Sequence, residues 1–268
     1  MAKTTTRKTV RKRRLLIGTI HLPPMPGSPR SRSSMDRITV AAVTEAKTLL
    51  DHGFEGFIVE NYGDAPFHPD RVPAVTIAAM TRVAGAVRRL GSFRLGINVL
   101  RNDASAAVAI AAVTAADFIR VNIHAGVFAT DQGLLEGRAH ETLRARSSLI
   151  PGLEIWADVL CKHARPVGPY PLEDAARDLV ERGLADRLIL TGSRTGSPLS
   201  PSDLKELARL QQGRAILVGS GLTPRNLKEY AAADGFIVGS YLRRGGRAGA
   251  PLDARRIRDF KAAVDALG

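Results

Sequence analysis

The residues best suited to proton transfer in this sequence lie at the end of a run that is typical of a buried strand. Asp158 is near the end of LEIWADVL (153–160), and Lys162 and His163 follow on the next loop. A carboxylate, an amine and an imidazole can together remove a proton, return it and stabilise the charge that develops. We expect Asp158 to be the general base. Lys162 would stabilise an oxyanion or face a second anionic group, and a Schiff-base role is disfavoured because it lies on a loop beyond the strand.

A second run carries polar side chains on alternate positions. In FIRVNIH (118–124), a period of two puts Arg120, Asn122 and His124 on one face and three isoleucine or valine residues on the other. If helices cover the apolar face, the polar face points inward, where His124 would join the acid-base chemistry. Polar residues at the ends of two earlier runs would orient the ligand. The candidate catalytic residues are Asp158, His124, Lys162, His163, Glu60, Asn98 and Asn122.

Two late runs, AILVGSG (215–221) and GFIVGS (235–240), each end in a Gly-Ser step. Glycine lets the main chain approach a ligand closely, and successive N–H groups and serine hydroxyls suit a phosphate. The Gly/Ser/Thr segment TGSRTGS (191–197) extends this rim, and Thr223-Pro224 begins a short predicted helix whose dipole would face the anion. The candidate phosphate-binding residues are Gly192, Thr195, Gly219, Ser220, Gly221, Gly239 and Ser240.

These residues need strands to position them, and the sequence supplies eight candidates separated by stretches of helical composition. The predicted strands are 15–22, 56–61, 94–100, 118–124, 153–160, 187–192, 215–221 and 235–240. The intervening helical segments include LEGRAHETLRARSSL, PLEDAARDLVERG and TPRNLKEYAAA. Strict strand-helix alternation predicts a (β/α)8 TIM barrel with its chemistry at the carboxyl ends of the strands and phosphate after strands 7 and 8. A doubly wound open sheet is the competing architecture, and we favour the barrel.

Charge inside such a barrel requires a partner, because an unpaired buried charge is costly. Arg120 therefore needs a carboxylate, and Glu154, Glu60 and Asp158 are the candidates. One alternative is that Arg120 and Glu154 form an ion pair low in the barrel with no chemical role.

The length of 268 residues fits one barrel domain, which we place at residues 15–268. Residues 1–14 contain seven of the positive charges behind a net charge of +13, so we expect a disordered basic tail that contacts an anionic membrane surface or is merely a tolerated extension. Specific nucleic-acid binding is disfavoured. The chain has no run long enough to span a membrane, no secretory apolar stretch and only one cysteine, which favours a cytoplasmic protein without disulfides. We also expect a homo-oligomer.

A metal site is an open alternative for the same face of the barrel. His21, Glu60, Asp158 and His163 are nitrogen and oxygen ligands of the right type, although no HxH or HExxH spacing supports the idea. We therefore assign no certain cofactor.

Eight ordered segments of the chain are similar to the signature blocks of the BtpA/SgcQ family. They are IGTIHLPPMPGSPR, FIVENYGDAPF, GINVLRND, FIRVNIHAGVFATDQGLLEG, ADVLCKHA, LTGSRTG, VGSGLTPRN and FIVGSYLRRGG. The resemblance runs from about residue 15 to the C-terminus and implies a ribulose-phosphate-binding type of (β/α)8 barrel. The family name comes from a cyanobacterial member linked to photosystem I biogenesis and specifies no reaction.

Two functions compete. The first is an enzyme of the phosphosugar lyase, isomerase or hydrolase kind that performs acid-base chemistry on a sugar phosphate or nucleotide-like compound. The second is a non-catalytic biogenesis or stability factor for a membrane complex of the photosystem I kind, with the loop 21–36 and the basic tail as docking elements. We favour the enzyme, with loop 21–36 as a lid, because a docking protein does not need many polar groups converging on one cavity.

Overall fold

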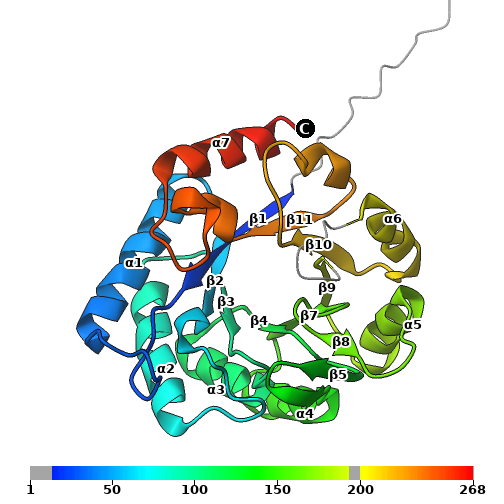
Figure 1. Ribbon diagram of the computed structural model, residues 1–268, viewed down its shortest axis with the longest axis horizontal. Coiled ribbons are helices and arrows are strands. Elements are labelled where there is room, and N and C mark those ends of the chain that lie inside the picture. Colours follow the sequence, from blue (N-terminus) through cyan, green and yellow to red (C-terminus); the bar gives the residue numbers. More distant parts are fainter. Residues whose placement is uncertain (1–13, 193–199, 268) are drawn as a thin grey trace, which may run out of the picture.

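The eight predicted strands form one closed parallel barrel in the computed structural model, which describes residues 14–192 and 200–267. Around the barrel the order is β1-β11-β10-β9-β7-β4-β3-β2, so the first and last strands pair and close the sheet (Figure 1). Apolar runs form these strands because helices cover the outer face and side chains fill the interior. The barrel strands are β1 (Leu15–His21), β2 (Gly56–Glu60), β3 (Arg94–Asn98), β4 (Phe118–Val121), β7 (Glu154–Asp158), β9 (Arg187–Leu190), β10 (Ala215–Gly219) and β11 (Gly235–Val238).

Helices surround the barrel in chain order (Figure 1). Several begin at a side-chain cap, as where Ser34 accepts from the N–H of Arg37 and Asp103 accepts from the N–H of Ala106. The helices are α1 (Met35–Asp51), α2 (Ala74–Arg88), α3 (Ala104–Thr114), α4 (Ala139–Leu149), α5 (Leu172–Arg177) with its π-helical continuation η2 (Asp178–Arg182), α6 (Pro201–Leu210) and α7 (Ala254–Asp265). Within the described ranges, none of the helices is both long and apolar enough to cross a membrane.

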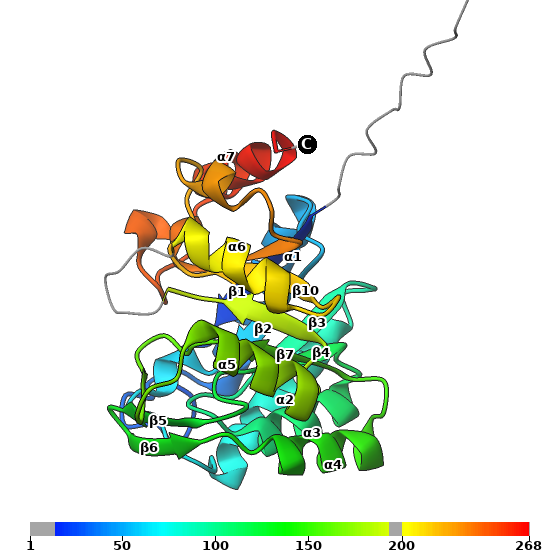
Figure 2. The ribbon, with the colours of Figure 1, turned by 90° about the vertical axis from the view of Figure 1, so that its right-hand side faces the viewer.

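The loops after two barrel strands, β4 and β7, form a small antiparallel sheet that was not expected from the sequence. It consists of β5 (Val127–Thr130), β6 (Gly133–Glu136) and β8 (Arg165–Pro166) in the order β6-β5-β8. The helix expected from residue 135 therefore begins at Ala139 instead, since the chain first completes a hairpin. In Figure 2 this hairpin projects to the left of the barrel strands.

The helix expected after Thr223 is also shorter than predicted. Only the four-residue 3-10 turn η3 (Leu227–Tyr230) forms. Asn226 caps the backbone N–H of Thr223 with its side chain, which holds a tight turn. The expected helix dipole toward an anion is consequently absent from this described segment.

An apolar layer fills the middle of the barrel and separates its two ends. Phe118 and Trp156 stack with ring centroids 3.5 Å apart, and Gly96 makes room for them, because a Cβ there would lie 2.3 Å from the Phe118 ring. The buried side chains of the layer are Ile17, Ile58, Phe118, Trp156, Ile189, Leu217 and Ile237.

The closing seam of the barrel is held by a buried arginine. Arg243 is 1% exposed and makes two hydrogen bonds to the carboxylate of Glu45 on α1, at 2.8 and 2.9 Å. It also donates to the carbonyl oxygens of Thr19 on β1 and Ala250. Arg14, which was expected to belong to the tail, lies directly before β1 and donates to the carbonyl of Ala231. The remainder of that predicted tail, 1–13, lies outside the described residues.

Candidate functional site

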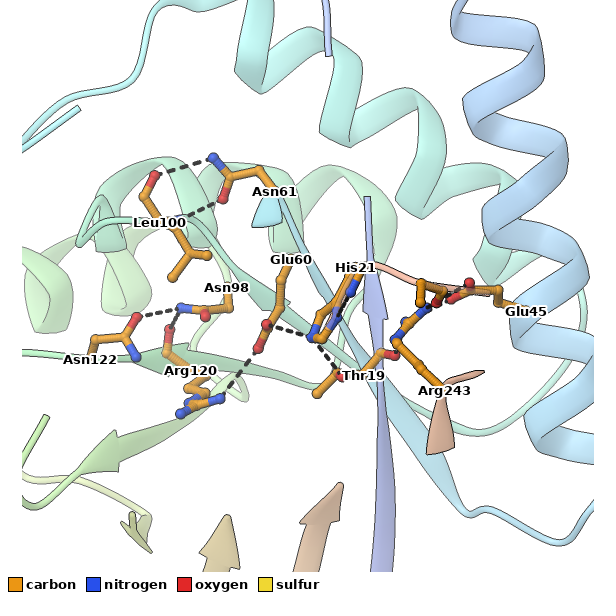
Figure 3. A network of polar contacts seen from close by, with 12 residues as sticks. Thr19, His21, Glu45, Glu60, Asn61, Asn98, Leu100, Arg120, Asn122 and Arg243 are labelled. Atoms are coloured by element: carbon orange, nitrogen blue, oxygen red, sulfur yellow. Dashed lines mark hydrogen bonds and ion pairs between the residues drawn. The ribbon is translucent and has the colours of Figure 1, made fainter. Parts of the chain in front are cut away.

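Three charged side chains from different strands meet above the apolar layer, at the carboxyl ends of the strands. Arg120 on β4 donates through Nε and Nη2 to the two oxygens of Asp158 on β7, both at 3.1 Å. Its Nη1 donates to Glu60 Oε1 on β2 at 3.3 Å, as Figure 3 shows. Arg120 thus has the carboxylate partners that its burial requires, and they are Asp158 and Glu60. We name Glu60, Arg120 and Asp158 the upper cluster.

Both oxygens of Asp158 are occupied within this cluster. Besides the two bonds from Arg120, Asp158 Oδ2 accepts from Asn122 Nδ2 at 2.9 Å. Asn122 in turn accepts from Asn98 Nδ2 at 3.1 Å. The Oδ1 atom of Asn98 is buried and has no hydrogen-bond partner within the described part of the chain. Of these groups, Asn98 Oδ1 therefore has an unused acceptor position, whereas the carboxylate of Asp158 is bound through both oxygens.

Glu60 has a different electrostatic environment. Burial raises the pKa of its carboxyl above the usual value, with the neighbouring Asp158 raising it further and Arg120 acting in the opposite direction. Its second oxygen, Oε2, lies 3.6 Å from Nε2 of His21. Arg120 is shared between two buried carboxylates, and Asp158 takes two of its hydrogen bonds whereas Glu60 takes one. Glu60 is therefore the carboxylate of the pair that can take up a proton.

His21, at the end of β1, contacts Glu60 in its neutral form. Burial, followed by the positive charges of Arg243 and Arg120, lowers the pKa of His21 to about 3. The N–H of Gly249 donates to Nδ1 at 3.2 Å, and Nε2 lies 2.9 Å from Thr19 Oγ1. With Nδ1 accepting, the proton is assigned to Nε2, which points toward Glu60 (Figure 3). Tyr62 stacks on the ring at 4.5 Å and fixes its orientation.

Glu154 belongs to a separate cluster at the other end of the barrel. Its Oε2 accepts from Arg187 Nε at 2.9 Å and from the indole of Trp156 at 2.7 Å, and it pairs with Arg94 at 2.6 Å. Although burial raises the pKa of Glu154, these three donors outweigh it and lower the pKa to about 2. We name Glu154, Arg94 and Arg187 the lower cluster. The alternative in which Arg120 pairs with Glu154 is wrong.

His124 does not lie on the inner face as the alternation predicted. The strand β4 ends at Val121, and the chain turns before His124, whose Nε2 bonds to the carbonyl of Gly183 at 2.8 Å. Burial lowers its pKa. His124 therefore packs against η2 on the outside of the barrel, and nothing in its contacts directs it to the upper cluster.

Lys162 and His163 lie on the loop that follows β7. Lys162 is partly exposed, and its carbonyl accepts from Arg101 at 2.6 Å. His163 is exposed with a positive φ of 62°, and partial burial together with the charges of Lys162 and Arg101 lowers its pKa. Both residues are beside the barrel mouth but not in contact with the upper cluster.

The two Gly-Ser turns lie side by side, because Gly219 pairs in register with Ile237. Ser220 and Gly221 both have positive φ, at 69° and 68°. Their N–H groups have no acceptor among the described residues. Gly239 is pressed against the site, since a Cβ there would lie 2.4 Å from Thr19 Oγ1 and 3.3 Å from the His21 ring.

The remaining phosphate candidates lie at or beyond the edge of the described chain. Ser240 opens the three-residue turn η4 (Ser240–Leu242). Gly192 is buried directly before the segment 193–199, and Thr195 falls within that segment, outside the described residues.

A cavity of about 1850 Å³ opens beside the upper cluster. His21 and His163 are among its lining residues, together with Tyr62 of η1 (Tyr62–Asp64), Arg101 and Cys161. The cluster itself and the Gly-Ser turns do not line it within the described ranges, so His21 is the residue that joins cavity and cluster. This volume exceeds that of most small-molecule sites.

The four candidate metal ligands are not brought together. His21 and Glu60 are neighbours and Asp158 is bound to Arg120, whereas His163 lies on the exposed loop. Across residues 14–192 and 200–267, no group of three or more His, Cys, Asp or Glu side chains is arranged to hold a metal ion. Arg101 was not among the candidates from the sequence, where it could have been noticed only as a charge just after a strand.

The fold and the position of these residues define a (β/α)8-barrel protein with a polar site at the carboxyl ends of its strands. The sequence profile described as the BtpA family matches residues 12–266, and the chain belongs to this family. It is 45% identical to the photosystem I biogenesis protein BtpA of Synechocystis sp., over 91% of this chain and 86% of that protein. It is 44% identical to an uncharacterized protein of Pyrococcus furiosus, over 91% and 92%. The expected resemblance is thereby confirmed.

Solved structures support the architecture. Phosphoribosyl anthranilate isomerase of Thermus thermophilus superposes with a TM-score of 0.55 at 15% identity, covering 95% of this chain and all of that one. At this identity the likeness concerns the fold alone.

Proposed function

We propose that this protein is an enzyme that performs acid-base chemistry on a phosphorylated small molecule bound at the carboxyl face of the barrel. The observation that carries the proposal is the upper cluster, in which buried Glu60 has a raised pKa beside a neutral His21. A general base or acid works best when its pKa lies nearer to neutrality than that of an ordinary carboxyl.

The roles differ from those expected from the sequence alone. Glu60 replaces Asp158 as the proton acceptor, because both oxygens of Asp158 are held by Arg120 and Asn122. His21 would donate a hydrogen bond through Nε2 to a developing oxyanion. Asn98, whose Oδ1 is unpartnered among the described atoms, would accept from a ligand hydroxyl.

The phosphate group would be held by the adjoining turns after β10 and β11. Successive N–H groups with positive φ at Ser220 and Gly221 suit an anion, and the hydroxyl of Ser240 lies on the neighbouring turn. The missing side chain of Gly239 lets the turn approach Thr19 and His21. This position would put a phosphorylated substrate next to Glu60.

Binding is tested by thermal unfolding with orthophosphate, sugar phosphates and nucleotides. We expect at least one to raise the Tm, and Gly219→Asp to remove the effect. A Cβ on Gly219 meets its nearest neighbour at 3.6 Å, so this variant should fold. Gly152→Asp is the matched control, because it adds the same charge in open space just before β7. No shift with any compound, or an unchanged shift in Gly219→Asp, would contradict the phosphate site.

Catalysis is tested with a compound that binds and is turned over. We expect Glu60→Gln to lower kcat by about 10²–10⁴-fold without unfolding the protein. Full activity in Glu60→Gln would refute its role, and failure of every bound compound to react would refute the enzyme.

A second candidate is a docking role in the biogenesis of a membrane complex, and the 45% identity to the Synechocystis protein favours it. Deleting residues 1–13 and measuring binding to anionic vesicles at low salt tests the basic segment as an anchor. Unchanged binding would exclude it.

A further inference from the structure

Arg101 is a buried cation without an anionic partner. It is 8% exposed. Arg243 is the other buried arginine among the described residues, and Glu45 neutralises it through both carboxylate oxygens. Arg101 instead donates through Nη2 to Lys162 O at 2.6 Å and Cys161 Sγ at 3.2 Å. It forms no ion pair with any described carboxylate, and the undescribed segments 1–13 and 193–199 contain no Asp or Glu.

The guanidinium of Arg101 has N–H donors without an acceptor among the described residues, and Arg101 lines the cavity. The described residues provide acceptors for Nη2 alone, so Nε and Nη1 remain for another group. Lys162 and His163 adjoin it, and Arg165 lines the same cavity. Burying a charge unpaired is costly, and an oxyanion in the cavity would offset that cost through a bidentate contact.

The location of Arg101 relates it to the phosphate turns. It follows β3, and β3 lies four strands from β10 in either direction around the barrel. The strand that precedes Arg101 therefore lies opposite the strand that precedes the Gly219 turn, and the upper cluster lies inside the barrel between these strands. A ligand that touched both Arg101 and the Gly219 turn would place its middle atoms near Glu60.

We propose that Arg101 is a second anion-binding subsite, so that the ligand is an extended molecule with a phosphate at one end and a carboxylate or second phosphate at the other. This rests on the proposed function for its phosphate end. The Arg101 subsite narrows the class of expected ligands from any phosphorylated compound to compounds with two anionic groups joined by a polar chain.

The test uses three probes with the same six-carbon chain, measured by calorimetry. Glucitol 6-phosphate carries one anion, 6-phosphogluconate adds a carboxylate, and glucitol 1,6-bisphosphate adds a phosphate. We expect at least one doubly anionic probe to bind about tenfold or more tightly than glucitol 6-phosphate. If 6-phosphogluconate binds more tightly than glucitol 1,6-bisphosphate, the group at Arg101 is a carboxylate. The reverse order identifies it as a second phosphate.

Arg101→Gln should abolish that preference while leaving the Kd of glucitol 6-phosphate within about twofold. Arg165→Gln, which removes an exposed arginine from the same cavity, should keep the preference. Absence of a preference in the wild type, or equal weakening of all probes in Arg101→Gln, would overturn the proposal.

Gluconate separates this proposal from the phosphate site. It carries only the carboxylate, so its weak binding should disappear in Arg101→Gln and persist in Gly219→Asp. If Gly219→Asp leaves phosphate binding intact, the proposed phosphate site is wrong, but the Arg101 subsite is not affected by that result. If Arg101→Gln leaves gluconate binding intact, the proposed Arg101 subsite is wrong, but the phosphate site is not affected.

Discussion

The upper and lower clusters place carboxylates and arginines inside the same barrel but in opposite proportions. In the lower cluster two arginines and an indole N–H surround Glu154 and lower its pKa to about 2. In the upper cluster Arg120 serves two carboxylates, and the pKa of Glu60 is raised. A surplus of donors fixes a carboxylate as an ion, whereas a shortage leaves one able to exchange a proton. The proportion of charges distinguishes the structural end of the barrel from the candidate catalytic end.

The largest effect should come from removing the shared cation. Arg120→Met leaves two buried carboxylates without a counter-charge, so we expect a loss of about 3–5 kcal/mol in the free energy of unfolding, measured by urea denaturation. Arg187→Met should lose only about 1 kcal/mol, because Arg94 still pairs with Glu154. Equal losses in the two variants would remove the distinction between the clusters.

The pH dependence of stability should have opposite signs at the two ends. Because the folded pKa of Glu60 is raised, its contribution is fully present below its unfolded value of 4.5 and is lost as pH rises through the folded value. Because the folded pKa of Glu154 is lowered, its contribution is present above 4.5 and is lost as pH falls toward about 2.

Denaturation of Glu60→Gln and Glu154→Gln across pH 3–8 measures this difference. Relative to wild type, Glu60→Gln should gain stability as pH rises, and Glu154→Gln should lose stability over the same range. Parallel curves would contradict the assignment.

The smallest effect concerns His21. With a pKa of about 3, its imidazole should stay neutral from pH 5 to 8, and its NMR resonances should not shift over that range. Arg243→Met removes one of the two nearby cations and should move the pKa upward, toward 6.5. An imidazole of His21 that titrates near 6.5 in the wild type would contradict the neutral donor.

The barrel was predictable because its strands are short apolar runs between turn residues. Strand alternation also predicted that Arg120 points inward and that Glu60 or Asp158 could pair with it. The choice among three carboxylates could not be predicted, because it depends on the stagger of neighbouring strands. Glu154 aligns with Phe118, two positions before Arg120, and this register puts the apolar layer between them.

Other features depend on where a strand stops. The alternation that placed His124 inside fails because β4 ends three residues earlier. The hairpin of β5 and β6 had no tight-turn signal strong enough to separate it from the helix that follows. The proposed roles of Arg101 and His21 could not be predicted, because they depend on contacts with residues that lie far away in the sequence.

The pairing of Arg243 with Glu45 spans 198 positions of the chain. A ribosome must therefore synthesise most of the protein before the first helix can meet this partner. Until β11 has also been synthesised, the edge of β1 that pairs with it stays open, and the early segments have no closed interior to enter. A fragment that ends before residue 243 should consequently bind chaperones and resist independent folding, so the segment from residue 243 onward controls when the whole barrel becomes stable.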